Sequence, residues 1–272
     1  MEQQGAVSGL RSRLFSAFVL AFLVVFLMAV IGLLVADALY IDAEAVRGAL
    51  HSQEIRAATW LSLWSSTVTT LIGLVFAVPI GYALSRYRFP GRILADTIVD
   101  LPIVFPPLVM GLSLLVFFRT PVGLWLESVG LDFVYERRGI VLVQFFVAAS
   151  FGIRAIKSTF DGIDRRQEDV ALTLGCTQGG AFWRVALPNA RGGIVAGAIL
   201  TWAKAFGIFG ALMVFVGMVR MRTEVLPTSI YLETSIGHIE TALAVALLMI
   251  GIATMALMLI RVLGGRPSVT VT

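Results

Sequence analysis

Residues 168–188 read EDVALTLGCTQGGAFWRVALP and form the longest amphipathic segment in a chain that is otherwise mostly apolar. The residues from 163 to 174 predict one helix. Gly175 is placed to end that helix, because glycine takes the left-handed conformation without a clash of a Cβ atom. The stretch therefore predicts a helix and a glycine turn between two apolar segments.

A second short helix is predicted after this turn. Thr177 is placed to cap its first turn, and one helical face is shared by Ala181, Phe182 and Val185. Pro188 stops this helix or starts the next segment, since a proline disfavours helix in the residue before it. Two helices around a glycine turn, with a small apolar knob, suit a segment that binds in a groove of another protein.

The same stretch resembles the EAA loop of ABC importer permeases, whose pattern is EAA-x3-G-x9-I-x-LP. The pattern falls with its full spacing on Asp169, Val170, Ala171, Gly175, Val185, Leu187 and Pro188. Asp, Val and Val at positions 169, 170 and 185 are conservative departures from Glu, Ala and Ile. In that family the loop docks into a cleft of the cytoplasmic ATPase subunit and couples its movement to the membrane gate. The resemblance implies this docking role for the seven residues and for Phe182, whereas the alternative is an ordinary amphipathic loop.

The composition places the chain in a lipid bilayer. Of its 272 residues, 58% are hydrophobic and 14% are charged, against about 25% charged residues in soluble domains. We expect an all-α membrane protein with a single transmembrane permease domain over residues 1–272, whose core the resemblance places at about 60–263. Six transmembrane helices are expected, at residues 14–39, 60–84, 93–118, 139–159, 192–218 and 239–263. A cytoplasmic coupling-helix loop is expected between helices 4 and 5.

The distribution of basic residues predicts the orientation. With both termini in the cytoplasm, thirteen Lys and Arg residues fall in inside segments and seven in outside segments, and positive residues collect on the inside of membrane proteins. The first apolar stretch is longer than the ~7–15 apolar residues of a signal peptide, so we expect it to remain as a span. These patterns predict a multi-pass protein of the cell membrane with residues 168–188 in the cytoplasm.

The third predicted span is interrupted by proline. It contains Asp100, Pro102, Pro106, Pro107 and Gly111, and each proline removes a backbone donor and breaks the helix. Non-helical backbone at membrane depth persists only where protein buries it or where it lines a cavity, so these residues are candidates for the pathway or its gate. The run also resembles the third span of the molybdate, tungstate and sulfate branch of these permeases. The alternative is a kinked structural helix without substrate contact.

The fifth predicted span carries one ionisable residue at depth, Lys204, ~18 Å into the span at the helical rise of 1.5 Å per residue. A charge at that depth is costly and indicates a function. Lys204 either offers positive charge to an anion or pairs with Asp100 or another buried acid, and we favour the pairing. This segment, with Gly207 and Gly210 as further pathway candidates, resembles the oxyanion branch, although Ile208 stands where that branch has Glu.

Enzymatic motifs are absent from the sequence. It contains no G-x-x-x-x-G-K-[ST] phosphate loop and no Ser-His-Asp or metal-ligand constellation, so we expect a transporter subunit that does not hydrolyse ATP itself. No catalytic residue, metal site or cofactor is assigned to this chain. His51, His238 and Glu233 lie in predicted loops and are expected to be plain surface residues.

The resemblance, which covers about residues 60–263, implies the transmembrane subunit of an ATP-driven, binding-protein-dependent importer that forms the translocation pathway. The partners it implies are two copies of a cytoplasmic ABC ATPase subunit that bind ATP and Mg, an extracytoplasmic substrate-binding protein, and a second permease subunit in a homodimer. The lipid bilayer surrounds the chain, and no nucleic acid is expected. The expected substrate is molybdate or tungstate. Alternatives are an ABC permease for sulfate, iron, polyamine or phosphonate, and an ion-gradient-driven secondary transporter.

Overall fold

Proline, glycine and short polar runs divide the chain into helices. The computed structural model describes residues 2–263 and contains no strand in that range; Arg266, one of the thirteen basic residues assigned to the inside, lies outside it. The long helices are α1 (Glu2–Tyr40), α3 (Gln53–Arg86), α7 (Arg137–Gly162), α10 (Leu187–Phe206) and α13 (Ile239–Leu263). The shorter ones are α2 (Ala43–His51), α4 (Arg92–Val104), α5 (Pro107–Phe117), α6 (Pro121–Ser128), α8 (Arg166–Thr173), α9 (Gln178–Ala181), the π-helical turn η1 (Phe182–Ala186), α11 (Gly210–Phe215) and α12 (Leu226–Ser235).

In the described residues, four helical segments are long and apolar enough to cross a membrane, and they lie in α1, α3, α7 and α13. The pair α4–α5 makes a fifth if it is counted as one span, although its halves are bent by 112°. α10 is not among them, because Asn189, Arg191 and Lys204 lower its hydropathy. The helices fall where spans were predicted, whereas the count of six spans stays a prediction.

The prediction of one continuous helix over residues 192–218 is wrong. α10 ends at Phe206 and α11 begins at Gly210. The end of α10 is held by Gln144 of α7, whose Nε2 donates to the carbonyl oxygen of Ala205 at 3.1 Å, and so satisfies one of the carbonyls that a helix end leaves open. Because residues 205–218 are apolar or glycine throughout, the hydrophobic pattern did not indicate the break.

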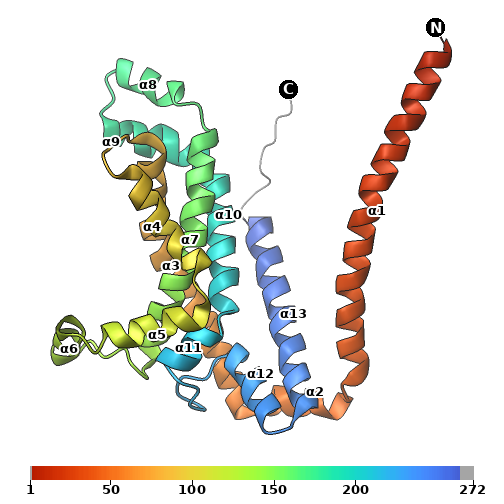
Figure 1. Ribbon diagram of the computed structural model, residues 1–272, viewed down its shortest axis with the longest axis vertical. Helices are drawn as coiled ribbons and strands as arrows, with labels where there is room; N and C mark the ends of the chain where they lie inside the picture. Colours follow the sequence, from red (N-terminus) through yellow and green to blue (C-terminus); the bar gives the residue numbers. More distant parts are fainter. Residues whose placement is uncertain (1, 264–272) are drawn as a thin grey trace.

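The helices α3, α7 and α10 lie side by side at the centre of the molecule (Figure 1). Small polar residues on α3 are buried there, and residues of this kind let membrane helices approach closely; they are Ser62, Ser65, Ser66, Thr69 and Thr70. Gln144 joins the helices, since its Oε1 accepts from Thr69 Oγ1 at 2.9 Å and its Nε2 donates to Ser65 Oγ at 3.2 Å. These contacts fix α3 and α7 against the end of α10.

α1 stands apart from this centre, beyond α13 (Figure 1). In its membrane-length segment Phe15–Tyr40, none of the most apolar window is buried within the chain. A helix that is apolar on all sides needs lipid or another chain around it. The first predicted span is therefore a separate element rather than part of the central bundle.

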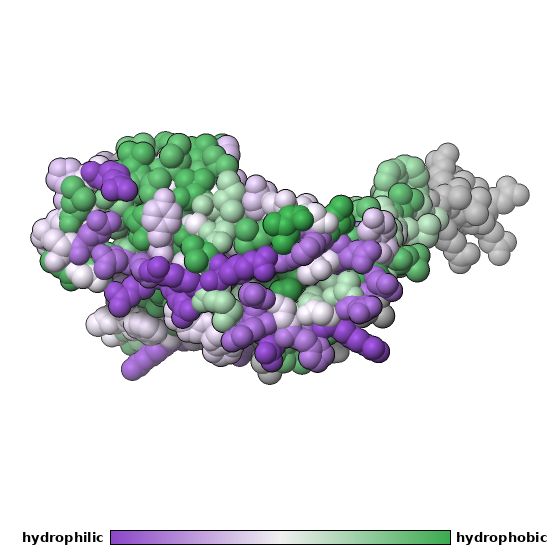
Figure 2. All heavy atoms as spheres, turned by 90° about the horizontal axis from the view of Figure 1, so that it is seen from below, coloured by the Kyte–Doolittle hydropathy of each residue, from purple (hydrophilic) through white to green (hydrophobic). Residues whose placement is uncertain are grey.

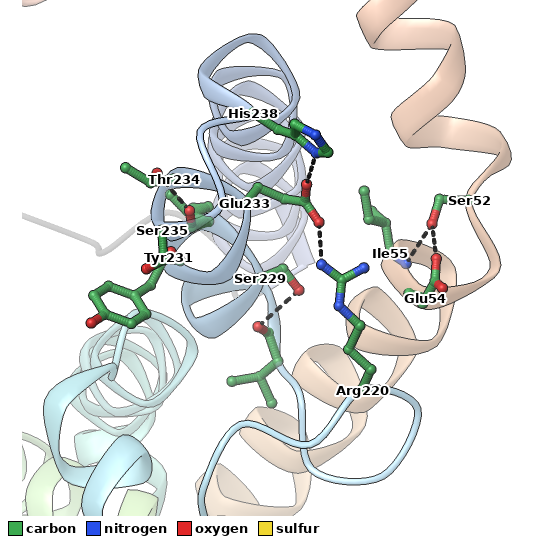
Figure 3. A network of polar contacts seen from close by, with 12 residues as sticks. Ser52, Glu54, Ile55, Arg220, Ser229, Tyr231, Glu233, Thr234, Ser235 and His238 are labelled. Carbon is green, nitrogen blue, oxygen red and sulfur yellow. Dashed lines mark hydrogen bonds and ion pairs between the residues drawn. The ribbon is translucent and has the colours of Figure 1, made fainter.

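Polar contacts join the loops at the end of the molecule opposite α8. Glu233 on α12 is 6% exposed; its Oε1 accepts from Arg220 Nη2 at 2.7 Å and its Oε2 lies 3.1 Å from His238 Nδ1 (Figure 3). Seen from this end, hydrophilic residues form a band across the face, with hydrophobic residues beside it (Figure 2). The prediction that Glu233 is a plain surface residue is wrong, because two basic side chains hold its carboxylate in a buried position.

Candidate coupling and pathway sites

The stretch 168–188 lies at one end of the bundle, as α8, α9, η1 and the start of α10 (Figure 1). The helix predicted from residue 163 begins only at Arg166, because α7 extends to Gly162 and a turn follows it. In this turn Asp164 Oδ1 accepts a hydrogen bond from the backbone N of Arg166 at 3.0 Å. Such a bond from a side chain to a nearby backbone group competes with helix and favours a turn.

The turn after α8 has the predicted chemistry. Gly175 has a φ of +90°, a conformation that favours glycine. Thr177 Oγ1 accepts from the backbone N of Gly180 at 3.1 Å and caps α9. Pro188 lies in the first turn of α10, so it starts the next helix. The predicted order of helix, glycine turn and capped second helix is confirmed at these positions.

Side chains of this stretch divide between an inner and an outer face. The Phe182 ring packs edge-on against Tyr82, with centroids 4.7 Å apart, and Ala181 is 2% exposed. The predicted knob of Ala181, Phe182 and Val185 therefore faces the bundle. Among the residues matched to the EAA pattern, Ala171, Val185 and Leu187 are wholly or partly buried, whereas the exposed ones are Asp169, Val170, Gly175 and Pro188. The large apolar side chains that point outward are Val170, Leu172, Leu174 and Trp183.

Two broken helices cross on one flank of the bundle. The first break separates α4 from α5 at residues 105–106, and the second separates α10 from α11 at residues 207–209. A Cβ atom on Gly210 would lie 3.5 Å from the backbone N of Leu108, and one on Gly111 would lie 2.5 Å from the carbonyl oxygen of Ala211. α5 and α11 are thus in backbone contact. Of the predicted pathway residues, Gly111 and Gly210 lie in this contact, and Pro106 and Pro107 directly precede Leu108 in the chain. The Cβ position of Gly207 is near only Ala203 of its own helix, and Pro102 lies inside α4 without breaking it.

Asp100 on α4 forms an ion pair with Arg154 of α7. Arg154 Nη1 also lies 3.4 Å from Asp96 Oδ1, and Lys157 Nζ lies 3.8 Å from Asp96 Oδ2. The favoured prediction was that Lys204 pairs with Asp100 or another buried acid, and the pairing with Asp100 is wrong because Arg154 takes that place. Acids four residues apart on α4 and bases three residues apart on α7 share helix faces, and the packing of α4 on α7 places those faces opposite each other.

Lys204 lies in the last turn of α10 rather than in the middle of an unbroken span. Its Nζ is 5.0 Å from the centroid of the Phe151 ring, within the range of a cation–π contact. None of the ion pairs in the described part of the chain includes it. The positive charge is favourable at the C-terminal end of a helix.

Ile208 lies in the break itself and is 3% exposed. It packs in an apolar cluster with residues of α5, α7 and α11. A carboxylate at this position would lose its hydration on burial, which is costly for an unpaired charge. The departure from the oxyanion-branch pattern is therefore matched by an apolar environment in this chain.

Three residues with structural roles were not singled out from the sequence. Gln144 is a lone amide in an apolar run, which is a detectable signal of a buried polar contact. Arg154 and Lys157 entered only the count of basic residues, because the helix face they share gains its meaning from the position of α4. A single sequence does not contain that position.

A bundle of helices long and apolar enough to cross a membrane, with a helical loop at one end, is the architecture of a multi-pass membrane protein. The family described as "Binding-protein-dependent transport system inner membrane component" matches residues 70–268. The chain belongs to this family, the permease subunits of ABC importers. Such a subunit spans the membrane, works with an ATPase and a periplasmic binding protein, and is not itself the ATPase.

The curated relatives include oxyanion permeases. The chain is 38% identical over 206 residues to a probable molybdenum ABC transporter permease protein of Haloferax volcanii, covering 76% of this chain and 74% of the relative. It is 39% identical over 173 residues to a molybdate/tungstate transport system permease protein of Thermococcus kodakarensis, covering 64% and 66%. It is 33% identical over 202 residues to a sulfate transport system permease protein of Escherichia coli, covering 73% and 69%.

Solved structures show the same fold. A bacterial ABC transporter involved in the import of the acidic polysaccharide alginate contains a chain that superposes with a TM-score of 0.73. The alignment covers 93% of this chain and 96% of that chain at 18% sequence identity. At this identity the likeness defines the all-α permease fold and not the substrate.

Proposed function

We propose that the chain forms the translocation pathway of an ATP-driven importer for molybdate or tungstate. The observation that carries this proposal is the 38–39% identity to two permeases named for these oxyanions. The position of Lys204 supports it, since an anion that reaches the end of α10 meets a cation without an acidic partner in the described residues. Sulfate is the second candidate, because a named sulfate permease is 33% identical over a similar length.

The pathway in this proposal runs along the crossing of the two helix breaks. Backbone groups that leave a helix keep their hydrogen-bonding capacity, and in a membrane they persist where they line a cavity or are buried in protein. Pro106, Pro107, Gly207 and Gly210 supply such backbone, Gly111 lets the two segments touch, and Lys204 supplies positive charge. Pro102 and Asp100 belong to the α4 wall, which Arg154 holds against α7.

The coupling end in this proposal is the stretch 168–188, in the cytoplasm. The exposed side chains Val170, Leu174 and Trp183 enter a cleft of an ATPase subunit, and Gly175 gives the turn its shape. Two ATPase copies and a second copy of this chain complete the membrane assembly. ATP binding shifts the gate only if the closed ATPase pair binds one conformation of the permease better than the other.

Transport in proteoliposomes tests the proposed function. The complete complex, with its ATPase and binding protein, is reconstituted with ATP inside, and uptake of labelled molybdate is measured with tungstate, sulfate or phosphate as competitor. We expect ATP-dependent uptake that tungstate suppresses at far lower concentration than sulfate. Stronger competition by sulfate than by tungstate would assign the second candidate, and uptake that follows an ion gradient without ATP would contradict the proposal.

A further inference from the structure

Glu168, in the first turn of α8, is buried with 6% of its surface exposed. Its Oε1 accepts from Arg86 Nε at 2.7 Å, and its Oε2 accepts from the Tyr82 hydroxyl at 2.6 Å. Tyr82 and Arg86 are four residues apart in the last turns of α3, so they share one helix face. Both carboxylate oxygens of an α8 residue are thus held by the end of a helix 82 residues away in sequence.

The same two α3 side chains also contact the segments on either side of α8. Arg86 Nη2 donates to the carbonyl oxygen of Ile163 at 3.0 Å, directly after α7. The Tyr82 ring packs edge-on against Phe160 of α7 at 5.3 Å and against Phe182 of η1 at 4.7 Å. The end of α3 therefore contacts the end of α7 on one side of α8 and η1 on the other.

α8 consequently presents different groups on its two sides. Glu168 points to α3, whereas Val170, two residues later, is 56% exposed. A carboxylate as deeply buried as that of Glu168 stays charged only beside a partner of opposite charge. Such a buried ion pair adds little to the stability of the fold, compared with apolar residues of the same size. What Glu168, Arg86 and Tyr82 supply beyond stability is one fixed position of α8 relative to α3.

We propose that Glu168, Arg86 and Tyr82 form a clamp through which movement of the docking stretch is transmitted directly to α3. α3 packs along both α7 and α10, so a displacement of its end reaches the centre of the bundle. Glu168 is a positioning residue in this proposal, and the exposed residues of α8 contact the ATPase. The inference rests on the proposed function, because it needs an ATPase docked on residues 168–188.

The test measures substrate taken up per ATP hydrolysed by the complete complex in proteoliposomes. Tyr82→Phe removes one hydroxyl and keeps the ring, and Glu168→Gln removes the charge. Tyr87→Phe is the matched control. The ring of Tyr87 packs against that of Tyr82, with centroids 6.0 Å apart, and Tyr87 is 46% exposed. A loss of stability alone lowers the amount of assembled complex but leaves the ratio of uptake to ATP unchanged in the complex that remains.

We expect Tyr82→Phe and Glu168→Gln to lower the ratio of uptake to ATP by about tenfold. This is the effect of losing a hydrogen bond to a charged group, when that bond is made in one conformation of the permease and not in the other. Tyr87→Phe is expected to leave it unchanged. If a single variant does not assemble, the double variant Arg86→Met with Glu168→Met removes both buried charges, and its ratio is measured instead. An unchanged ratio in the variants that assemble overturns the clamp.

A companion measurement separates failure of the clamp from failure of the proposed docking. Leu174→Ser tests docking alone, because this side chain at the end of α8 is 81% exposed. Weakened ATPase association in Leu174→Ser, together with a normal uptake ratio in Tyr82→Phe, overturns only the clamp. Unchanged association in Leu174→Ser contradicts the docking proposal and the clamp with it.

Discussion

Lys204 holds its ammonium over the Phe151 ring at the end of α10. Lys204 is half-buried, and a cation–π contact contributes about 0.5–2 kcal/mol and leaves the charge of the ammonium unchanged. The contact therefore holds the side chain in place without neutralising it. This balance suits a site that an anion occupies and then leaves.

Replacing Lys204 with methionine removes the charge and keeps a side chain of similar length. We predict that Lys204→Met lowers molybdate uptake by tenfold or more, while the amount of complex in the membrane stays the same. Lys204→Arg is the control that retains the charge and is expected to retain most of the uptake. The measurement is initial uptake normalised to assembled complex, and normal uptake by Lys204→Met would contradict a role for this cation.

Individual residues could be predicted where the chemistry is local. Gly175, Thr177 and Pro188 have the predicted conformations because turn and capping preferences act within a few residues. The partner of Asp100 could not be predicted, because Arg154 reaches it across a helix pair. Spacing gives the face on which a side chain lies, but only packing decides which face lies opposite.

At the scale of elements, the docking stretch depends on the shape of its turn. Gly175 has a φ of +90°, and nothing lies within 4 Å of the position that a Cβ atom would take. The cost of a side chain there is therefore conformational rather than steric, about 1–2 kcal/mol for a residue in the left-handed region. The turn orients α8 relative to α9, so its shape decides how the exposed side chains meet a partner.

We predict that Gly175→Ala weakens the association of the ATPase by about tenfold. The reason is that alanine disfavours the turn that docking requires by about 1–2 kcal/mol. Gly179→Ala is the matched control, because Gly179 lies in α9 with a negative φ and open space around its Cβ position. Association is measured by co-purification or by titration of the ATPase onto the permease in nanodiscs. Equal affinity of the two variants would show that the turn geometry is not needed for docking.

The crossing of α5 and α11 gives a second prediction for single elements. A Cβ atom on Gly111 would lie 2.5 Å from the carbonyl oxygen and 2.9 Å from the Cα of Ala211, whereas one on Gly210 would make only ordinary contacts from 3.5 Å. Gly111→Ala is therefore expected to destabilise the bundle by about 1–3 kcal/mol through overpacking and to lower uptake, whereas Gly210→Ala is tolerated. Thermal unfolding in detergent compares them, and equal unfolding temperatures would contradict the close contact.

The helix breaks were only half predictable. Pro106 and Pro107 indicated the break between α4 and α5, because proline lacks the backbone donor that a continuing helix requires. The break after α10 arises where Gln144 of α7 bonds the carbonyl oxygen of Ala205, and a contact between helices leaves no mark in the hydrophobic pattern. The orientation of the face with Phe182 and Val185 was also not predictable. Periodicity identified this face as apolar, and we expected it to bind another protein, whereas it packs against the bundle.

At the scale of the whole molecule, the chain leaves apolar side chains exposed at the docking end. Leu174 and Trp183 are 81% and 66% exposed, and large apolar side chains in clefts of a partner carry much of the energy of an interface. The four or five apolar spans of the described residues, the isolated α1 among them, likewise need lipid or other subunits around them. Composition predicted this membrane setting, whereas the exposed docking side chains required the packing of the stretch 168–188.

We predict that Trp183→Ser weakens ATPase binding by at least about tenfold, the scale of an anchoring side chain at an interface, without lowering the amount of folded permease. Trp125→Ser is the control, because Trp125 on α6 is 61% exposed and lies away from the docking end. The comparison needs only affinity measurements on the two purified variants. A larger loss of affinity from Trp125→Ser would place the ATPase on another surface.

The substrate is tested most directly by the elemental content of cells with and without this chain, grown on trace molybdate, tungstate, sulfate and iron together. Restoring the intact chain and restoring Lys204→Met are the two complementation arms. We predict that the deletion selectively lowers molybdenum and tungsten, that the intact chain restores both, and that Lys204→Met does not. Unchanged molybdenum and tungsten, with sulfur or iron lowered instead, would contradict the proposed oxyanion pathway.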